Sequence, residues 1–179
     1  GANINSALLA VTRKANATWV IPSEDEWYKS AYHKNDGVTS NYWDYPTRSN
    51  TAPGQDMADA SGNNANYYTA PYANPIDSGK YTTIAGEFQN SASPYGTFDQ
   101  GGNVWEWNEA VLSGVYRGLR GVSFDTYGNN LASSYRYYNN PTGGNNALGF
   151  RVVSEVPEPT SLGLLSLGGL ALLRRKRRA

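Results

Sequence analysis

Side chains that commonly carry out chemistry are scarce in this sequence. Its 179 residues contain no cysteine and a single histidine, His33. The chain therefore forms no disulfide, thiolate–zinc site or iron–sulfur cluster, and it has no cysteine nucleophile. One histidine also excludes a metal site built from several imidazoles. Because His33 stands beside Lys34 on a predicted helix, we expect a solvated surface residue rather than the base of a catalytic triad.

Charged residues are balanced in number, 15 acidic and 15 basic, but not in position. Five basic residues lie within the last six positions: Arg174, Arg175, Lys176, Arg177 and Arg178. The rest of the chain has 10 basic and 15 acidic residues and a formal charge of −5. It lacks the clustered Lys and Arg that nucleic-acid binding requires, so we expect no nucleic-acid partner. A mildly acidic body is compatible with hard cations.

One helix has a clear start signal. Ser23 is suited to the N-cap position, and Glu26, three residues later, completes a capping box. We expect the helix to run to about His33, with Trp27 and Ala31 facing inward. Residues 1–18 are expected to be weakly structured.

The remaining elements are predicted to be short. Residues 35–92 are dense in Asn, Gly, Pro, Ser, Thr and Tyr, which favours an ordered loop region that something besides an apolar core must fix, bound metal being one candidate. Short strands are expected at 19–21, 115–124, 135–138 and 149–153, and in residues 98–107 after a turn. Antiparallel pairing among them gives a small sheet. The predicted class is α+β with low regular secondary structure.

The last 25 residues, 155–179, form a tail distinct from the domain at 1–154. It begins with Pro157, Glu158 and Pro159, and residues 161–173 are all Leu, Gly, Ala or Ser. A membrane-spanning helix needs about 20 apolar residues, so this segment predicts a weak or transient membrane stop. Since an exported protein needs a signal peptide and the chain starts at Gly1 without one, we also expect a missing N-terminal part.

The order of motif, apolar segment and basic end resembles the PEP-CTERM sorting signal of Gram-negative bacteria. The resemblance implies transient retention at the inner membrane and processing by an exosortase near Pro157–Pro159. It also implies loss of the tail and delivery to the cell envelope or extracellular matrix.

Four segments of the body are similar to the formylglycine-generating enzyme family, also called sulfatase-modifying factors. Residues 101–107 read Gly-Gly-Asn-Val-Trp-Glu-Trp and are close to the family's Gly-Asn-Val-Trp-Glu-Trp. Residues 19–27, 120–124 and 148–151 resemble the family's Leu-Pro-Thr-Glu-x-Glu-Trp, Arg-Gly-Gly-Ser-Trp and Gly-Phe-Arg. The resemblance implies a C-type-lectin-like fold, low in regular structure and stabilised by calcium.

The family oxidises a substrate cysteine with copper held by two cysteines. Thr126 and roughly Gly128 occupy those places here, and neither supplies a soft thiolate for copper. One histidine also cannot supply the three-histidine iron site of a related branch. We therefore expect no catalytic residues.

The sequence is compatible with calcium, which takes oxygen ligands from carboxylates, amides and carbonyls. The resemblance implies a first site at Asp99, Glu106 and the carbonyls of Gly102 and Val104. It implies a second site at Asn66, Asp77 and the carbonyls of Tyr67 and Gly79. The tryptophans Trp27, Trp105 and Trp107 are expected in the core, and Arg120 and Arg151 in buried pairs with acids or backbone.

Three functions remain open from the sequence. The first is a non-catalytic, calcium-stabilised, surface-displayed module that binds an extracellular protein or glycan. The second is an enzyme of the same family, or of its nonheme iron branch, with altered chemistry. The third is an architectural component of an extracellular matrix.

Overall fold

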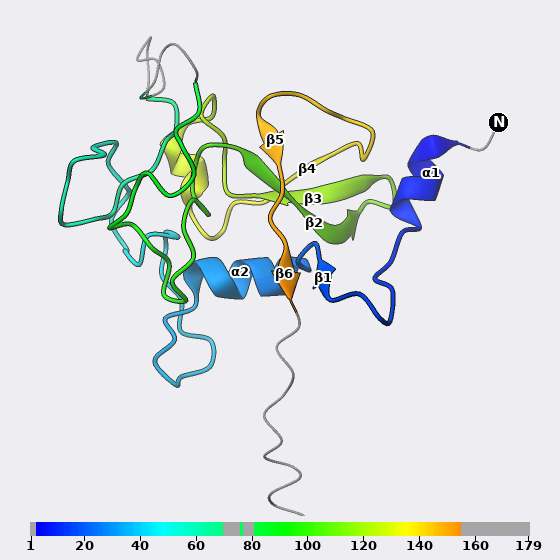
Figure 1. Ribbon diagram of the computed structural model, residues 1–179, viewed down its shortest axis with the longest axis horizontal. Helices are drawn as coiled ribbons and strands as arrows, with labels where there is room; N and C mark the ends of the chain where they lie inside the picture. The colour runs from blue at the N-terminus through cyan, green and yellow to red at the C-terminus, as the bar shows by residue number, and fades with distance from the viewer. Residues whose placement is uncertain (1–2, 70–75, 77–80, 155–179) are drawn as a thin grey trace, which may run out of the picture.

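Irregular backbone surrounds a small sheet in the computed structural model, which describes residues 3–69, 76 and 81–154 (Figure 1). The predicted α+β class with little regular structure is confirmed. The elements in chain order are α1 (Ile4–Leu9), β1 (Trp19–Val20), α2 (Glu24–Tyr32), β2 (Trp105–Leu112), β3 (Tyr116–Arg120), the 3₁₀ helix η1 (Gly128–Leu131), β4 (Tyr137–Asn139), β5 (Leu148–Gly149) and β6 (Val153–Ser154). No helix among these described residues has the length and apolar character to cross a bilayer, and the tail lies outside them.

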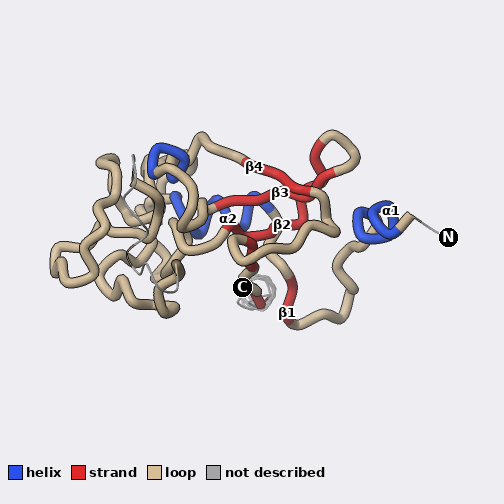
Figure 2. The backbone as a smooth tube through the Cα atoms, turned by 90° about the horizontal axis from the view of Figure 1, so that it is seen from above, coloured by secondary structure: helices blue, strands red, loops and turns tan. Residues whose placement is uncertain are grey.

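The main sheet has the strand order β4-β3-β2-β5, and β1 pairs separately with β6. Strand β3 is antiparallel to both of its neighbours, β2 and β4, as expected. Strand β5 instead runs parallel to β2, with Trp105 opposite Leu148. Residues 140–147 carry the chain from the β4 edge back to the start of β2, so β5 enters in the direction of β2 (Figure 1). Figure 2 shows the sheet between α1, at one end of the molecule, and most of the long loops, at the other.

Backbone conformation sets the boundaries of two strands. As predicted, a turn precedes the strand in residues 98–107: β2 begins at Trp105, because Asp99, Gly102 and Asn103 have positive φ angles of 55°, 84° and 66°. A side chain at Gly102 would overlap the Asn66 carbonyl, so only glycine fits this turn. Strand β3 ends at Arg120, since the next residue, Gly121, has a φ of 100°. The predicted last strand is divided into β5 and β6.

Helix α2 forms as the sequence predicts. The Ser23 side chain accepts from the backbone of Glu26, whose carboxylate accepts from the Ser23 backbone, and both bonds of the capping box are present. Trp27 and Ala31 are buried, together with Tyr32. The capping hydrogen bonds join residues three positions apart, so the sequence alone was sufficient to predict the start of this helix.

Helix α1 was not expected. Its last carbonyls are held by Arg117 of β3, whose Nη2 donates to the backbone oxygens of Leu8 at 2.9 Å, Leu9 at 3.0 Å and Val11 at 2.8 Å. Cationic donors at a helix C-terminus satisfy carbonyls that have no partner within the helix. The partner lies more than 100 residues away in sequence, so no local pattern signals it.

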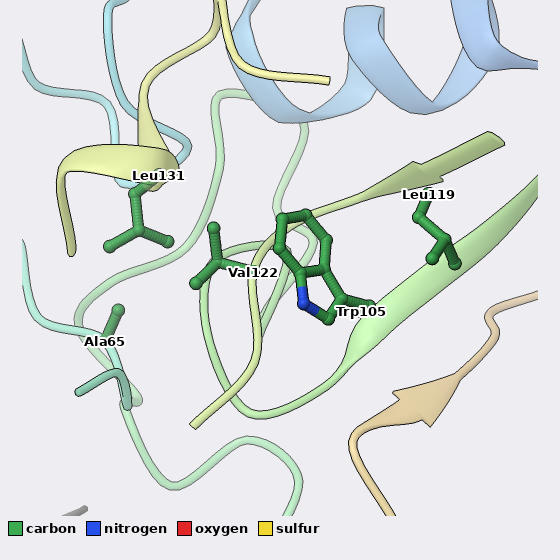
Figure 3. Close-up of a cluster of buried hydrophobic side chains, with 5 residues drawn as sticks. All are labelled: Ala65, Trp105, Leu119, Val122 and Leu131. Atoms are coloured by element: carbon green, nitrogen blue, oxygen red, sulfur yellow. The ribbon is translucent and has the colours of Figure 1, made fainter. Parts of the chain in front are cut away.

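The core consists of two apolar clusters. One packs loop, sheet and η1 together (Figure 3) and contains Ala65, Trp105, Leu119, Val122 and Leu131. The other lies on α2 and contains Trp27, Ala31 and Tyr32. Trp107 packs half-buried against the first cluster, so the predicted core role of the three tryptophans is confirmed.

Candidate functional site

The carboxylate of Glu106 is fully engaged at the junction of α2 and the sheet. Glu106 is 6% exposed, and its Oε2 accepts from Trp27 Nε1 at 2.6 Å. Arg151 approaches both oxygens, with Nε 2.5 Å from Oε2 and Nη2 2.6 Å from Oε1. A paired guanidinium already balances this buried charge. The predicted pairing of Arg151 is confirmed, and a calcium ion at Glu106 would have to compete with it.

The other members of the first predicted calcium site have separate partners. Asp99 is half-buried, and its Oδ2 accepts from the backbone of Gly86. The Gly102 carbonyl accepts from the backbone of Val104 at 2.9 Å. Within the described ranges, no group of three or more His, Cys, Asp or Glu side chains could hold a metal ion. These contacts do not favour Glu106 as a calcium ligand.

Asn66, in the second predicted site, has an unusual environment. It is 1% exposed, and its Nδ2 donates to the carbonyl of Tyr81 at 2.9 Å and to Asn103 Oδ1 at 3.0 Å. Its Oδ1 is buried without a hydrogen-bond partner in the described part of the chain. Exchanging Oδ1 and Nδ2 of Asn66 would not solve this, because Oδ1 would then face the Tyr81 carbonyl and Asn103 Oδ1. Asn103 Oδ1 is itself fixed as an acceptor, since the Thr83 backbone donates to it. A cation near Oδ1 would satisfy it.

The rest of that second site is only partly described. The Tyr67 carbonyl accepts from Gln55 Nε2 and has a second lone pair available. Asp77 and Gly79 lie outside the described residues. Asn66 and Tyr67 thus each have an oxygen of the kind that calcium binds.

An open cleft of about 350 Å³ lies beside the sheet. Three aromatic rings line it together with carboxylate, hydroxyl and amide side chains, and the lining residues are Trp105, Asp125, Thr126, Tyr135, Tyr137, Asn139, Asn145, Ala147 and Leu148. The Trp105 ring centroid is 5.2 Å from that of Tyr137 and 5.9 Å from that of Tyr135. Neither Lys nor Arg is among the lining residues that the structure describes.

A buried arginine holds the cleft's aromatic segment in place. Arg120 is 8% exposed, and its Nη1 donates to the carbonyls of Ser133 at 2.9 Å and Tyr135 at 2.5 Å. Its other nitrogens bind Glu24 at the start of α2 at 2.7 and 3.0 Å. The same carboxylate pairs with Arg136. The predicted buried pairing of Arg120, with acid and backbone alike, is confirmed.

A second, larger hollow of about 420 Å³ lies between α1, β1 and β2. Its lining is mainly apolar and includes Trp19, Val11 and Ile21. It contains none of the residues that the sequence singled out for metal binding.

The comparisons with known proteins agree with the arrangement of these motifs. The model of the "Sulfatase-modifying factor enzyme 1-like domain" matches residues 2–156, and the PEP-CTERM protein-sorting motif matches residues 155–178. The chain belongs to the sulfatase-modifying factor family. The two matches overlap at residues 155 and 156.

Curated relatives of this sulfatase-modifying factor chain resemble only part of it. A serine/threonine-protein kinase pkn1 of Chlamydia caviae is 33% identical over an alignment of 84 positions, covering 36% of this chain and 14% of the relative. The pkn1 kinase of Chlamydia pneumoniae is 30% identical over 83 positions, covering 36% and 13%. The chain thus spans about a seventh of the curated relatives that it matches.

Solved structures share the fold at low sequence identity. The crystal structure of CarF aligns with a TM-score of 0.55 and 20% identity, over 80% of this chain and 50% of CarF. Treponema denticola variable protein 1 aligns at 0.51 and 22%, over 77% and 48%. PvdO from Pseudomonas aeruginosa aligns at 0.51 and 21%, over 77% and 53%. The chain therefore spans about half the length of each.

Of the two places that the family resemblance assigns to copper-binding cysteines, Thr126 and roughly Gly128, the first lies at the cleft. Thr126 lines it, with its hydroxyl 2.9 Å from Ser123 Oγ. Gly128 opens η1 against the Tyr67 ring, where an added Cβ would overlap Cε2 and lie 2.7 Å from Cδ2. The Tyr67 hydroxyl is fixed by a 2.6 Å bond to the Pro53 carbonyl. This sulfatase-modifying factor domain therefore has neither thiolates nor, at residue 128, space for a cysteine.

His33 is less solvated than expected. It is half-buried at the C-cap of α2, where Nε2 contacts the Val38 carbonyl at 2.9 Å and Nδ1 contacts the Tyr95 hydroxyl at 2.8 Å. The backbone of Asn35 also donates to Nδ1. The ring thus connects α2 to two loops that sequence proximity does not reveal.

Most of the cleft is not apparent from the sequence. Among its lining residues, Trp105 is expected in the core, Thr126 stands at a place assigned to a copper-binding cysteine, and Leu148 opens the motif at 148–151; the sequence gives the others no role. The available signal was the alternation at Tyr135, Tyr137 and Asn139, which places these three side chains on one face of the strand.

Proposed function

We propose that this sulfatase-modifying factor domain is a non-catalytic binding module, displayed outside the cytoplasm, that holds an extracellular protein or glycan in the cleft. The observation that carries the proposal is the cleft that Thr126 lines. The two places that the family resemblance assigns to copper-binding cysteines hold a hydroxyl at Thr126 and a glycine packed on Tyr67 at residue 128. The cleft is open, aromatic and polar, which is typical of ligand sites.

The tail supports display. Its match to the PEP-CTERM sorting motif supports export to the cell envelope by exosortase-mediated sorting. We propose in addition that cleavage near Pro157–Pro159 follows transient inner-membrane contact and releases the folded body to the envelope or extracellular matrix. Replacing Pro157, Glu158 and Pro159 with alanine should then leave a larger, membrane-retained product on immunoblots of fractionated cells; a product of unchanged size and location would contradict this step.

The test of non-catalysis uses the purified full chain. It is incubated with Cu(I) or Fe(II) and then desalted, after which metal content and the oxidation of a cysteine-containing peptide are measured by mass spectrometry. A family enzyme that has both cysteines serves as the positive control. We expect substoichiometric metal and no formylglycine. Stoichiometric copper or iron with turnover of the peptide would overturn the proposal and favour the altered enzyme.

We also propose that calcium stabilises the loop region through Asn66. The support is its buried Oδ1, which has no hydrogen-bond partner within the described residues. A ligand that binds only the folded state raises the melting temperature, so calcium should raise it relative to chelator in the wild type and not in Asn66→Ala. Asn64→Ala removes a buried amide of the same loop, whose Nδ2 binds Asp59 and Gly62, and should keep the calcium shift. No shift in the wild type would contradict the calcium proposal.

A further inference from the structure

We infer that the cleft binds a neutral, hydroxyl-rich saccharide, a short segment of an uncharged polysaccharide chain. The inference rests on the proposed function and names the ligand class of the same site. It follows from three properties of the cleft. These are an exposed aromatic ring, polar side chains that use one atom for a local hydrogen bond and leave another available, and a lining that contains a carboxylate but no cation.

The platform is the ring of Tyr137. Tyr137 is 42% exposed and lies against the buried Trp105, whose ring is tilted 34° to it. Side chains alternate along this segment: those of Tyr135, Tyr137 and Asn139 line the cleft, while Arg136 pairs with Glu24 away from it. A supported aromatic face carries partial negative charge and attracts the weakly positive C–H groups of a sugar ring.

Three polar side chains around the platform are each held by one atom. Asn139 Oδ1 accepts from the Asn140 backbone at 2.7 Å, and Asn145 Oδ1 accepts from the Ala147 backbone at 2.9 Å. Asp125 Oδ1 accepts from Ser123 and Thr126. The two amide nitrogens and Asp125 Oδ2 form no other hydrogen bond within the described residues. They provide two donors and an acceptor, and a sugar hydroxyl both donates and accepts.

Charge and size restrict the ligand further. The described lining contains the carboxylate of Asp125 and no cationic side chain, so sulfated or uronic sugars and phosphates find no counter-charge. A volume of about 350 Å³ is near the lower end of the roughly 300–1,000 Å³ typical of small-ligand sites, which suits a short sugar segment. The adjacent edge strand β4 has three residues and offers a peptide little backbone to pair with.

The experiment screens the full chain, kept in a detergent without a sugar headgroup, against an array of oligosaccharides. The probes are neutral glucose, mannose, xylose and N-acetylglucosamine oligomers, with uronic and sulfated oligomers beside them. The best probe is then titrated by calorimetry against wild type, Tyr137→Ala and Tyr138→Ala. Tyr138 is the control on the same strand: it is 47% exposed, packs against Tyr116 and lies 5.8 Å from the Tyr137 ring, but it does not line the cleft.

We expect neutral oligomers to bind, Tyr137→Ala to weaken binding at least about tenfold, and Tyr138→Ala to leave it unchanged. Preference for the acidic oligomers, or equal affinity in both variants, would overturn the inference. Failure of every oligosaccharide would also overturn it. If a peptide then binds in a Tyr137-dependent manner, the proposed function survives while the saccharide class fails; turnover of the cysteine peptide would instead remove the proposed function.

Discussion

Two polar regions of the molecule use similar side chains in opposite ways. At the junction of α2 and the sheet, both oxygens of Glu106 are bound by Trp27 and Arg151. At the cleft, Asp125 and Asn145 each use one polar atom for a local turn and keep another available. Buried groups with every partner satisfied stabilise the fold, whereas oriented groups with spare capacity can bind a ligand.

This difference changes the meaning of the family motif. Glu106 belongs to its most recognisable segment, yet the residue connects three parts of the chain rather than facing an open site. The cleft is instead built mainly from residues between the motifs at 120–124 and 148–151. The most recognisable motif thus stabilises the scaffold, and the proposed binding site lies mainly in the stretch between motifs.

The largest expected effect is on Glu106. Because Glu106→Ala leaves Arg151 and Trp27 Nε1 without their partner, the free energy of unfolding should fall by about 3–5 kcal/mol. Denaturant titration measures this. Glu109→Ala on the same strand is the control, since its partly exposed ion pair with Arg13 should contribute less than about 1 kcal/mol.

The same titration, repeated with calcium and with chelator, separates the two roles considered for Glu106. A purely structural carboxylate gives the same loss in both conditions. A loss that appears only with calcium would show that Glu106 binds the ion, and it would contradict the comparison drawn above.

A smaller effect is expected where the cleft meets the loop region. Gly128→Ala forces a Cβ against the fixed Tyr67 ring, and overpacking of this kind costs about 1–3 kcal/mol. Gly144→Ala is the matched control, because nothing lies within 4 Å of the added atom. Equal stabilities of the two variants in thermal unfolding would mean that residue 128 has room for a side chain after all.

An exposed ion pair at the start of α2 should show a weaker, pH-dependent effect. The hydrogen bond from Arg13 lowers the pKa of Glu26 from 4.5 to about 2. A carboxyl whose pKa is depressed on folding stabilises the protein above its unfolded value and loses that contribution as the pH falls from 4.5 toward 2. Since the Glu26 side chain is 45% exposed, the loss should stay below about 1 kcal/mol.

Glu26→Gln should remove this part of the pH dependence while keeping an oxygen for the Ser23 backbone. Unfolding titrations at pH 5 and pH 3 measure it. An identical pH dependence in wild type and variant would show that the pair contributes nothing to stability.

The smallest change in stability is expected at the cleft. Asn145→Ala removes an exposed side chain and one turn hydrogen bond, and surface substitutions of this kind usually change stability by about 0.5 kcal/mol or less. Saccharide affinity should fall nevertheless. A large loss of stability in calorimetric melts would place Asn145 with the structural residues and break the distinction between the two regions.

The features that the sequence predicted correctly depend on neighbouring residues or on the type of one residue. The capping box of Ser23 and Glu26 needs three residues of separation, and the burial of Trp27 follows from its size on an inward helix face. That Arg120 and Arg151 would pair with acid or backbone also followed from their type. The identity of their partners, Glu24 and Glu106, depends on contacts 96 and 45 residues apart.

The cleft was not predicted because it, too, depends on contacts between residues far apart in the sequence. Trp105, Asp125 and Asn145 meet only after β5 crosses to the far side of β2 and residues 140–147 fold over the sheet. The parallel pairing of β5 was itself unexpected. A local pattern fixes the orientation of Asn145 through its bond to the Ala147 backbone, but it does not show which residues Asn145 faces.

The central claim is that this domain binds an extracellular component through Tyr137 and catalyses no reaction. Its most direct test is the retention of the purified full chain on isolated envelope and matrix material of the producing cell, measured for wild type, Tyr137→Ala and Tyr138→Ala. The account predicts retention of wild type and Tyr138→Ala and release of Tyr137→Ala. Equal retention of all three proteins, or retention of none, would contradict it.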